Sequence, residues 1–378
     1  MGQLIRKLLA LLIPPVTLVY GFSFVVLALG GELTPVGSVV RRQFNSDAPL
    51  VYGLSYSNPV KPLKLAGLRS RAPSVAVLGT SRVLQFRAPM FKNRAGFYNA
   101  GGASATLWDL RALVEMLPRP RQPELLIVGL DQYLFNSNFA EFRASSPFTE
   151  TAWHAVVHNS RSVALDDYLD AKFTLSALLD NAVRGNRVGL NAIMNNNGFR
   201  NDGSYHYGQF LVDPRGAAND DLDFKDTFRR IADGNRRFEY GSHVSREAIE
   251  EVQALLRLCR LRQIHVVAFL PPFAHQVYER MMSMPENYGY LLELRKVLPR
   301  IVAAEGFPLF DFTDLASIGA SDEEMIDGFH TSERASLRVL LEIRRGDAIL
   351  DRYVADEATL QARLARASPF SVFGDGEF

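Results

Sequence analysis

The sequence predicts an α/β fold in which a parallel sheet is covered by helices on both faces. Short apolar runs, such as 74–78, 124–130 and 264–270, alternate with segments whose apolar residues recur at helical spacing. The runs are apolar at consecutive positions, which is typical of parallel strands buried on both sides. In such a sheet the functional site is expected at the carboxyl ends of the strands.

Several elements can be placed in order. The segment 96–102 is expected to be a short strand that ends in a glycine turn, and 104–117 has one apolar helical face that ends before Pro118. Further along, Ser245 is a plausible N-cap for a helix reaching Gln263. The remaining predictions are a strand at 264–270, a helix at 288–304, a strand at 309–312 and a helix from Thr331 or Ser332 to about Ile343.

Composition sets the class of protein. The chain has 378 residues, of which 47% are hydrophobic and 22% are charged, so it can bury a large core. A net charge of +1 provides no field that would recruit nucleic acid. Its single cysteine, Cys259, lies in an apolar stretch and is expected to be a buried thiol, and no disulfide within the chain or cysteine zinc site can form.

The first 31 residues are expected to be a cytoplasmic tip followed by a membrane anchor. Arg6 and Lys7 precede a charge-free run of about 22 residues, 8–29, which is long enough to span a bilayer. Pro14 and Pro15 would kink this helix. A cleaved signal peptide is the alternative. The basic N-terminus would remain in the cytoplasm of a bacterium, and the rest would be exported from a single-pass position in the inner membrane.

Beyond the anchor we expect a stalk at 32–72, a main domain at 73–350 and a C-terminal tail at 351–378. The domain's strand and helix rhythm breaks at about 133–244, which is predicted to be an insertion over the carboxyl edge of the sheet. The insertion includes an Asn- and Gly-rich stretch with Tyr205 and His206. This stretch is either a surface loop or a substrate-facing lid.

A serine and an Asp-x-x-His pair point to nucleophilic catalysis. Ser81 follows the run 74–78, and a serine hydroxyl becomes a useful nucleophile only beside a base and an orienting carboxylate. Asp327 and His330 are three residues apart, so both can lie on one side of a turn. Without such partners Ser81 would be an ordinary N-cap of the following helix.

Four segments together resemble the conserved blocks of the SGNH (GDSL-like) hydrolase superfamily. They are Gly79-Thr80-Ser81, Gly101-Gly102, Gly129-Leu130-Asp131-Gln132 and Asp327-Gly328-Phe329-His330. The anchor and insertion are most similar to bacterial accessory proteins of polysaccharide O-acylation, of the alginate O-acetylation and D-alanine transfer types. The resemblance implies a flavodoxin-like fold with Ser81 as nucleophile, His330 as base and Asp327 as its orienting carboxylate.

Two departures from that pattern affect the oxyanion hole. Thr80 stands where the hydrolases commonly have Asp, and Asp131-Gln132 replaces an Asn-Asp pair. Backbone N–H groups at Ser81, Gly101 and Gly102, together with Gln132, are the remaining candidate donors. Losing one oxyanion donor costs about 100-fold to 1000-fold in rate, so slow chemistry is expected. We expect Arg82, Asp131, Tyr205 and His206 to bind substrate.

These observations predict an exported acyltransferase that moves an acyl group, most plausibly acetyl, to or from a cell-envelope polysaccharide. A ping-pong route would load the acyl group on the nucleophile before a sugar hydroxyl receives it. Expected partners are the polysaccharide, the membrane and a membrane-bound O-acyltransferase. No cofactor or nucleic acid is expected. No metal is expected either, since only His154 and His158 have metal-like spacing. An esterase with the same triad and a non-catalytic polysaccharide-binding or scaffold subunit remain alternatives.

Overall fold

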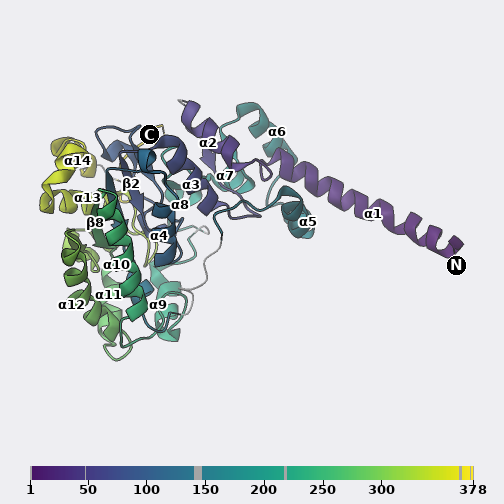
Figure 1. Cartoon of the computed structure of the whole chain (residues 1–378). Coiled ribbons are helices and arrows are strands. Elements are labelled where there is room, and N and C mark those ends of the chain that lie inside the picture. Colours follow the sequence, from purple (N-terminus) through teal and green to yellow (C-terminus); the bar gives the residue numbers. More distant parts are fainter. Residues whose placement is uncertain are drawn as a thin grey trace. The chain divides into compact units, whose positions relative to one another are not determined.

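A computed structural model describes residues 2–46, 48–139, 147–216, 219–365, 368–374 and 376–377. The chain divides into two compact units (Figure 1). The smaller unit comprises residues 1–59, 149–201 and 206–209, and the larger comprises 60–148, 202–205 and 210–378.

A five-stranded parallel sheet forms the centre of the larger unit. Its order is β3-β2-β4-β8-β9, and each pair of neighbouring strands is parallel. The strands are β2 (Val75–Leu78), β3 (Phe97–Asn99), β4 (Leu125–Gly129), β8 (His265–Leu270) and β9 (Leu309–Asp311). All residues of β2, β3 and β4 are buried, so both faces of the sheet are covered. The predicted α/β class and parallel sheet are confirmed.

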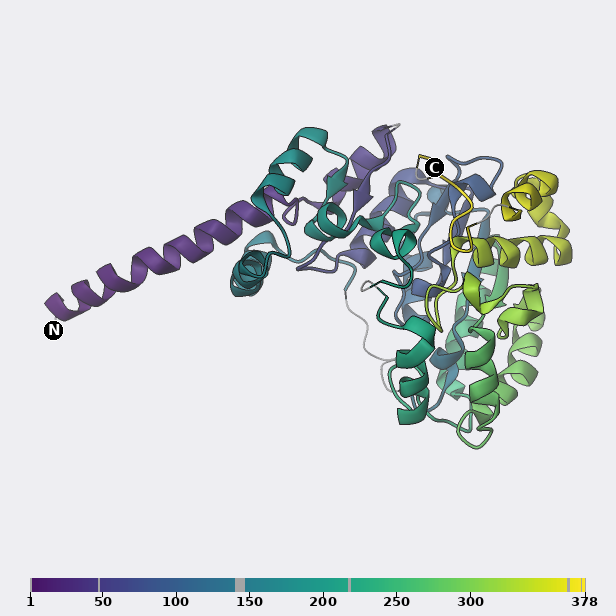
Figure 2. The ribbon, with the colours of Figure 1, turned by 180° about the vertical axis from the view of Figure 1, so that it is seen from behind.

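Helices pack on this sheet and on each other. Along the chain they are α3 (Val60–Arg71), α4 (Leu107–Glu115), α9 (Lys225–Asp233), α10 (Arg246–Leu261), α11 (His275–Met282), α12 (Gly289–Ala304), α13 (Glu333–Gly346) and α14 (Glu357–Leu364). Contacts join α4 to α10 and α10 to α12. Helix α13 packs on α14, and both are drawn in yellow-green to yellow in Figure 2. One continuous core of buried side chains runs through the sheet and these helices.

Local sequence signals explain where the helices begin. The Ser245 hydroxyl accepts the Ala248 N–H, which confirms the predicted N-cap of α10. Ser332, rather than Thr331, caps α13 through Ala335 N–H. The helix expected from residue 104 begins only at Leu107. Cys259 is buried on α10, as predicted, and burial raises the pKa of its thiol to about 12.

The smaller unit combines the N-terminal helix with a separate four-stranded sheet of order β5-β1-β6-β7. Its strands are β1 (Val51–Tyr52), β5 (Arg187–Val188), β6 (Asn197–Phe199) and β7 (Tyr205–Tyr207). Its helices are α1 (Gly2–Leu29), α2 (Val36–Asn45), α5 (Trp153–Leu169), α6 (Leu175–Arg184) and α7 (Leu190–Asn195); α8 (Gly208–Val212) follows β7. The C-terminal part of α1 contacts α5 and α6.

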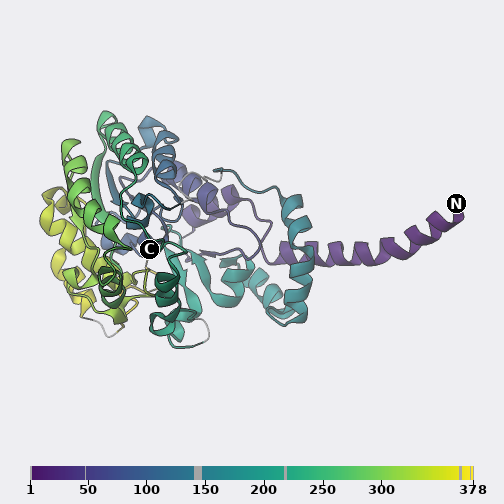
Figure 3. The same ribbon diagram turned by 90° about the horizontal axis from the view of Figure 1, so that it is seen from below.

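Helix α1 is long and apolar enough to cross a membrane. It continues through Pro14 and Pro15 as one helix, seen in purple in Figure 3, so the expected kink does not interrupt it. Most of its described side chains are exposed. Such exposure of an apolar surface is unusual in a water-soluble helix.

The expected stalk and insertion are organised differently in the structure. Residues 32–59 form part of the smaller unit, where β1 pairs with β5 and β6, whereas α3 belongs to the larger unit. Within 133–244, only 149–201 and 206–209 join the smaller unit. Within 164–188 the chain forms two helical pieces, since α5 ends at Leu169 and α6 spans Leu175–Arg184.

Candidate active site

The end of β2 delivers Ser81 to a tight turn. Gly79 and Gly129 leave room for Val83, because a Cβ at either glycine would lie within 3 Å of a Val83 methyl group. A 3₁₀ turn then spans Ser81–Val83, and the residue that caps it is Thr80, whose hydroxyl accepts the Arg82 N–H. Ser81 is therefore not an N-cap, and its side chain is free to face another element.

Three side chains from distant parts of the sequence form one hydrogen-bonded chain. The Ser81 Oγ lies 2.8 Å from Nε2 of His330, and Nδ1 of the same ring lies 2.7 Å from Oδ2 of Asp327. Ser81 and His330 are partly exposed, so a reactant can reach them. This is the order of contacts in a nucleophile, base and orienting carboxylate.

The loop before α13 fixes the orientation of Asp327. Its Oδ1 accepts the backbone N–H groups of Phe329 and His330 at 2.7 and 2.6 Å. Burial raises the pKa of the Asp327 carboxyl, but the His330 charge and these hydrogen bonds outweigh burial and hold the pKa below its ordinary value. Asp327 is therefore a stable anion that holds the imidazole with Nε2 toward Ser81.

The side chain of Arg82, the residue that follows Ser81, is fully buried. Its guanidinium donates to Asp131 Oδ1 at 3.0 Å and to Gln132 Oε1 at 2.8 Å. It also donates to the carbonyls of Phe329 and Pro271, and it stacks between two rings, those of Phe273 and Phe329, 4.3 and 4.4 Å from their centroids. Arg82 thus ties the ends of β2, β4 and β8 to the loop that carries the base.

The network leaves neither Arg82 nor Asp131 for substrate binding. Their side chains have no exposed surface, and the Thr80 hydroxyl occupies the second Asp131 oxygen at 2.7 Å. Their expected role as substrate contacts is therefore corrected to one of positioning. Gln132 is also buried, and its amide group donates to the Pro271 carbonyl and the Thr313 hydroxyl. It has no N–H left for an oxyanion.

The glycine turn after β3 is closed in a similar way. The Gly101 N–H donates to Asn99 Oδ1 at 2.8 Å, and the Gly102 N–H donates to the carbonyls of Gly79 and Thr80. Of the expected oxyanion donors, only the Ser81 N–H makes no hydrogen bond to any part of the chain that the structure describes. One of the expected donors therefore remains open, and the loss of a donor from an oxyanion hole typically costs about 100-fold to 1000-fold in rate.

Asn99 is a positioning residue that the sequence reasoning missed. Its amide donates to the carbonyls of Val83 and Phe86 at 2.8 and 2.9 Å, while its oxygen accepts from Gly101. It therefore fastens the segment after Ser81 to the turn after β3. The sequence feature that could have indicated this role is the position of Asn99, a polar residue at the end of an otherwise apolar strand.

The remaining expected site residues lie elsewhere. The backbone of Tyr205 is bonded to Leu84 and to the Gln85 side chain, beside the segment that follows the nucleophile. His206 belongs to the smaller unit, where its Nδ1 lies 2.6 Å from the Asn196 carbonyl oxygen. The structure therefore brings Tyr205, but not His206, into the unit that holds the triad.

No metal-binding cluster of three or more His, Cys, Asp or Glu residues occurs among the described residues. His158 Nδ1 lies 3.1 Å from the Tyr20 hydroxyl. Two other His–Asp pairs occur in the larger unit: His275 Nδ1 lies 2.9 Å from Asp314, and His265 Nε2 lies 2.8 Å from Asp347. The hydrogen bond to Asp314 raises the pKa of His275 despite some desolvation. In the part of the chain that the structure describes, neither of these two rings is hydrogen-bonded to a serine hydroxyl.

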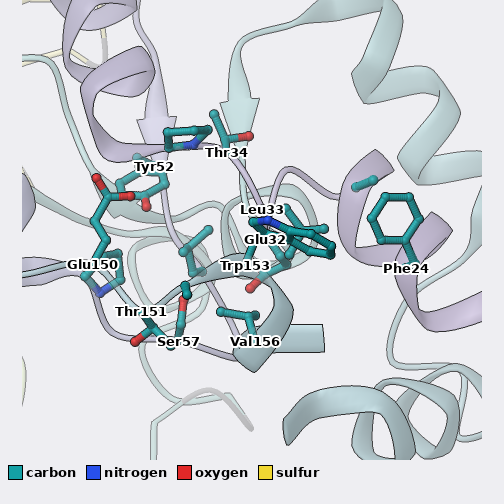
Figure 4. A pocket seen from close by; sticks show the side chains of 15 residues that line it. Phe24, Glu32, Leu33, Thr34, Tyr52, Ser57, Glu150, Thr151, Trp153 and Val156 are labelled. Atoms are coloured by element: carbon teal, nitrogen blue, oxygen red, sulfur yellow. The ribbon is translucent and has the colours of Figure 1, made fainter. Parts of the chain in front are cut away.

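An apolar pocket of about 520 Å³ lies in the smaller unit, at the C-terminal end of α1. Figure 4 shows its aromatic lining, Phe24, Tyr52 and Trp153, with the carboxylates Glu32 and Glu150. Glu32 accepts backbone N–H groups of Ser55, Tyr56 and Leu190 in this unit. None of the pocket's lining residues comes from the unit that holds Ser81.

Comparison with known proteins places the chain in no family. No protein-family model matches the sequence, and no curated protein matches it significantly.

Proposed function

We propose that this protein is a membrane-anchored, exported acyltransferase of the SGNH type, with a flavodoxin-like catalytic domain, that carries out O-acetyl transfer on a cell-envelope polysaccharide. The observation that carries the proposal is the hydrogen-bonded chain from Ser81 through His330 to Asp327 at the carboxyl edge of a parallel sheet. The same residues occupy the first and last blocks of the SGNH pattern.

In the proposed first half-reaction, Ser81 Oγ attacks the acyl carbonyl while His330 Nε2 takes its proton. Collapse of the tetrahedral intermediate forms a Ser81 ester and expels the donor's leaving group, which receives the proton from His330. In the second half-reaction a sugar hydroxyl attacks this ester, with His330 again as base, and Ser81 is regenerated. Asp327 stabilises the imidazolium throughout.

Transfer to a bound acceptor fits this site better than rapid hydrolysis does. A single open oxyanion donor lowers the intrinsic rate, whereas a sugar hydroxyl held against the acyl ester gains effective concentration that water lacks. An esterase would use the same triad with water as acceptor. A polysaccharide-binding subunit would have no need of the Ser81 hydroxyl.

The membrane anchor and a multi-span acyltransferase partner are part of the proposal. The length and apolar surface of α1 support a single crossing. At its C-terminal end Phe24 and Trp153 are exposed and meet edge to face, with centroids 6.1 Å apart. Exposed aromatic side chains in that position are typical of the membrane–water interface. The catalytic unit would then face the periplasm or cell exterior.

The test uses the full-length protein in detergent with 4-nitrophenyl acetate as donor and a soluble oligosaccharide as acceptor. Mass spectrometry should detect acetylated oligosaccharide with the wild type and none with Ser81→Ala. Ser283→Ala is the matched control, because its hydroxyl is exposed and, among the described residues, donates only to the Arg280 carbonyl on α11. Acetate release without acetylated sugar would identify an esterase. If Ser81→Ala formed the same amounts of product as the wild type, the catalytic role of Ser81 would be excluded and the alternative of a polysaccharide-binding subunit would be favoured.

A further inference from the structure

A cluster of arginines lies in the larger unit, just after α9. Arg230, Arg236 and Arg237, with Phe139 and Glu239, line a pocket of about 280 Å³. The lining carries three positive charges and one negative charge. Such a concentration of guanidinium groups favours a carboxylate or phosphate ligand.

Aromatic contacts connect this pocket to the triad. The Arg237 guanidinium lies 5.7 Å from the Tyr133 ring centroid and 5.9 Å from that of Phe329. Phe329 precedes His330 in the chain, and their ring centroids are 5.1 Å apart. Phe139, on the pocket wall, packs edge to face on Tyr133 at 5.0 Å. The pocket therefore adjoins the loop that carries the catalytic base.

The acidic groups of this region leave Arg237 uncompensated. Asp226 pairs with Arg229 and Arg230 and lies 3.5 Å from Arg236. Glu239 uses one oxygen to accept the Arg237 backbone N–H at 3.1 Å, and its other oxygen is buried without a partner.

Among the described residues no carboxylate pairs with the Arg237 side chain, which is exposed, and the buried Nε of Arg230 has no hydrogen-bond acceptor.

The backbone at this point is strained. Arg236 and Arg237 are consecutive non-glycine residues with φ of 52° and 78°. Non-glycine residues rarely adopt a positive φ, and they keep it where the surrounding structure imposes it. The next residue, Phe238, is buried against Phe273 and Phe329, and this contact fixes the loop. Arg237 is thereby held over the rings of Tyr133 and Phe329.

We propose that Arg237, with Arg230 and Arg236, binds an anionic group of the glycan. This binding places a hydroxyl or ester group of the same glycan beside Ser81. The inference rests on the proposed function and adds that the substrate is an acidic glycan. Its anionic group is a sugar carboxylate or a phosphate, which a planar guanidinium can bind through two hydrogen bonds.

Equilibrium binding tests this inference without requiring turnover. Full-length Ser81→Ala protein in detergent is titrated with a glucuronate-containing oligosaccharide, a phosphorylated gluco-oligosaccharide and the neutral gluco-oligosaccharide of equal length. One or both acidic probes should bind more tightly than the neutral one, and the tighter acidic probe identifies the anion. Adding the Arg237→Gln substitution should weaken the binding of that probe about 10-fold to 100-fold, which is the range expected for hydrogen bonds to charged groups.

Arg246→Gln is the matched control, because it removes the same charge from a 91% exposed side chain on α10. It should leave the affinity for the acidic probe unchanged. Equal binding of acidic and neutral probes, no binding of either acidic probe at millimolar concentration, or equal losses in Arg237→Gln and Arg246→Gln would overturn the inference.

Turnover by the wild type separates the two proposals. Where acetyl transfer or hydrolysis occurs, Arg237→Gln should lower kcat/KM for an acidic acetylated sugar relative to a neutral one, mainly through KM. Selective acidic binding without any turnover would contradict the proposed catalysis while leaving the anion site in place. Turnover with no acidic preference would contradict only the anion site.

Discussion

Replacing Arg82 with Met should destabilise the larger unit strongly. The substitution keeps a long side chain between Phe273 and Phe329 but removes every donor of the buried guanidinium. Asp131 would keep only the Thr80 hydroxyl, and the Pro271 carbonyl would keep only Gln132. Leaving one partner of a buried ion pair uncompensated costs about 3–5 kcal/mol. That is a large fraction of a typical stability of about 5–15 kcal/mol.

The measurement is thermal unfolding of the full-length protein in detergent, followed by circular dichroism. At about 2–4 °C per kcal/mol for a large domain, Arg82→Met should lower Tm by about 6–20 °C. Arg82→Met combined with Asp131→Asn should recover part of this loss, since it removes the unpaired charge. A Tm within 2 °C of wild type for Arg82→Met would contradict this stabilising role of Arg82. So would a double variant whose loss in Tm equals the sum of the losses in the two single variants.

Three further predictions concern the triad and the anchor. Ser81→Ala and His330→Ala should each abolish acetyl transfer, and the double variant should lose little more, since triad members act as a unit; multiplied losses would show that His330 acts separately. The lowered pKa of Asp327 means that its stabilising contribution is present above about pH 4 and lost as pH falls through the folded-state value. The difference in free energy of unfolding between wild type and Asp327→Asn should therefore become smaller when unfolding is measured at successively lower pH below about pH 4. A difference that stays constant with pH would contradict this. A C-terminal alkaline phosphatase fusion should be active in a bacterial host, and an inactive but well-expressed fusion would exclude export.

Much of the larger unit could be predicted from sequence because its signals are local. Fully apolar runs specify buried parallel strands, and the helix at Ser245 follows from a cap and an apolar face. The Ser81, Asp327 and His330 set was found because its chemistry demands those residue types at strand and loop ends. The geometry agrees with that expectation, while the catalytic role remains a prediction.

Other features depend on contacts that no local pattern encodes. Strand β1 has two residues and pairs with β5 more than 130 positions later, so it carries no periodic signal. Gln132 was expected to face the oxyanion because of its position after β4, but Arg82 and Thr313 turn its amide inward. Arg237 is one of many arginines, and only its place above Tyr133 and Phe329 distinguishes it.

The departures from the SGNH pattern become understandable as one linked change. The first block has Thr80 in place of an acid, and the third has the acid Asp131 in place of an amide; the Thr80 hydroxyl donates to Asp131 across the adjacent strands β2 and β4. The Asp131 carboxylate at the end of β4 is in turn paired with the buried Arg82 guanidinium. Under the proposed function, this exchange removes an amide that would donate to an oxyanion, so we expect a low rate of hydrolysis by water. We therefore expect the proposed catalysis to depend on how well the acceptor is held, which is the property that separates a transferase from a hydrolase.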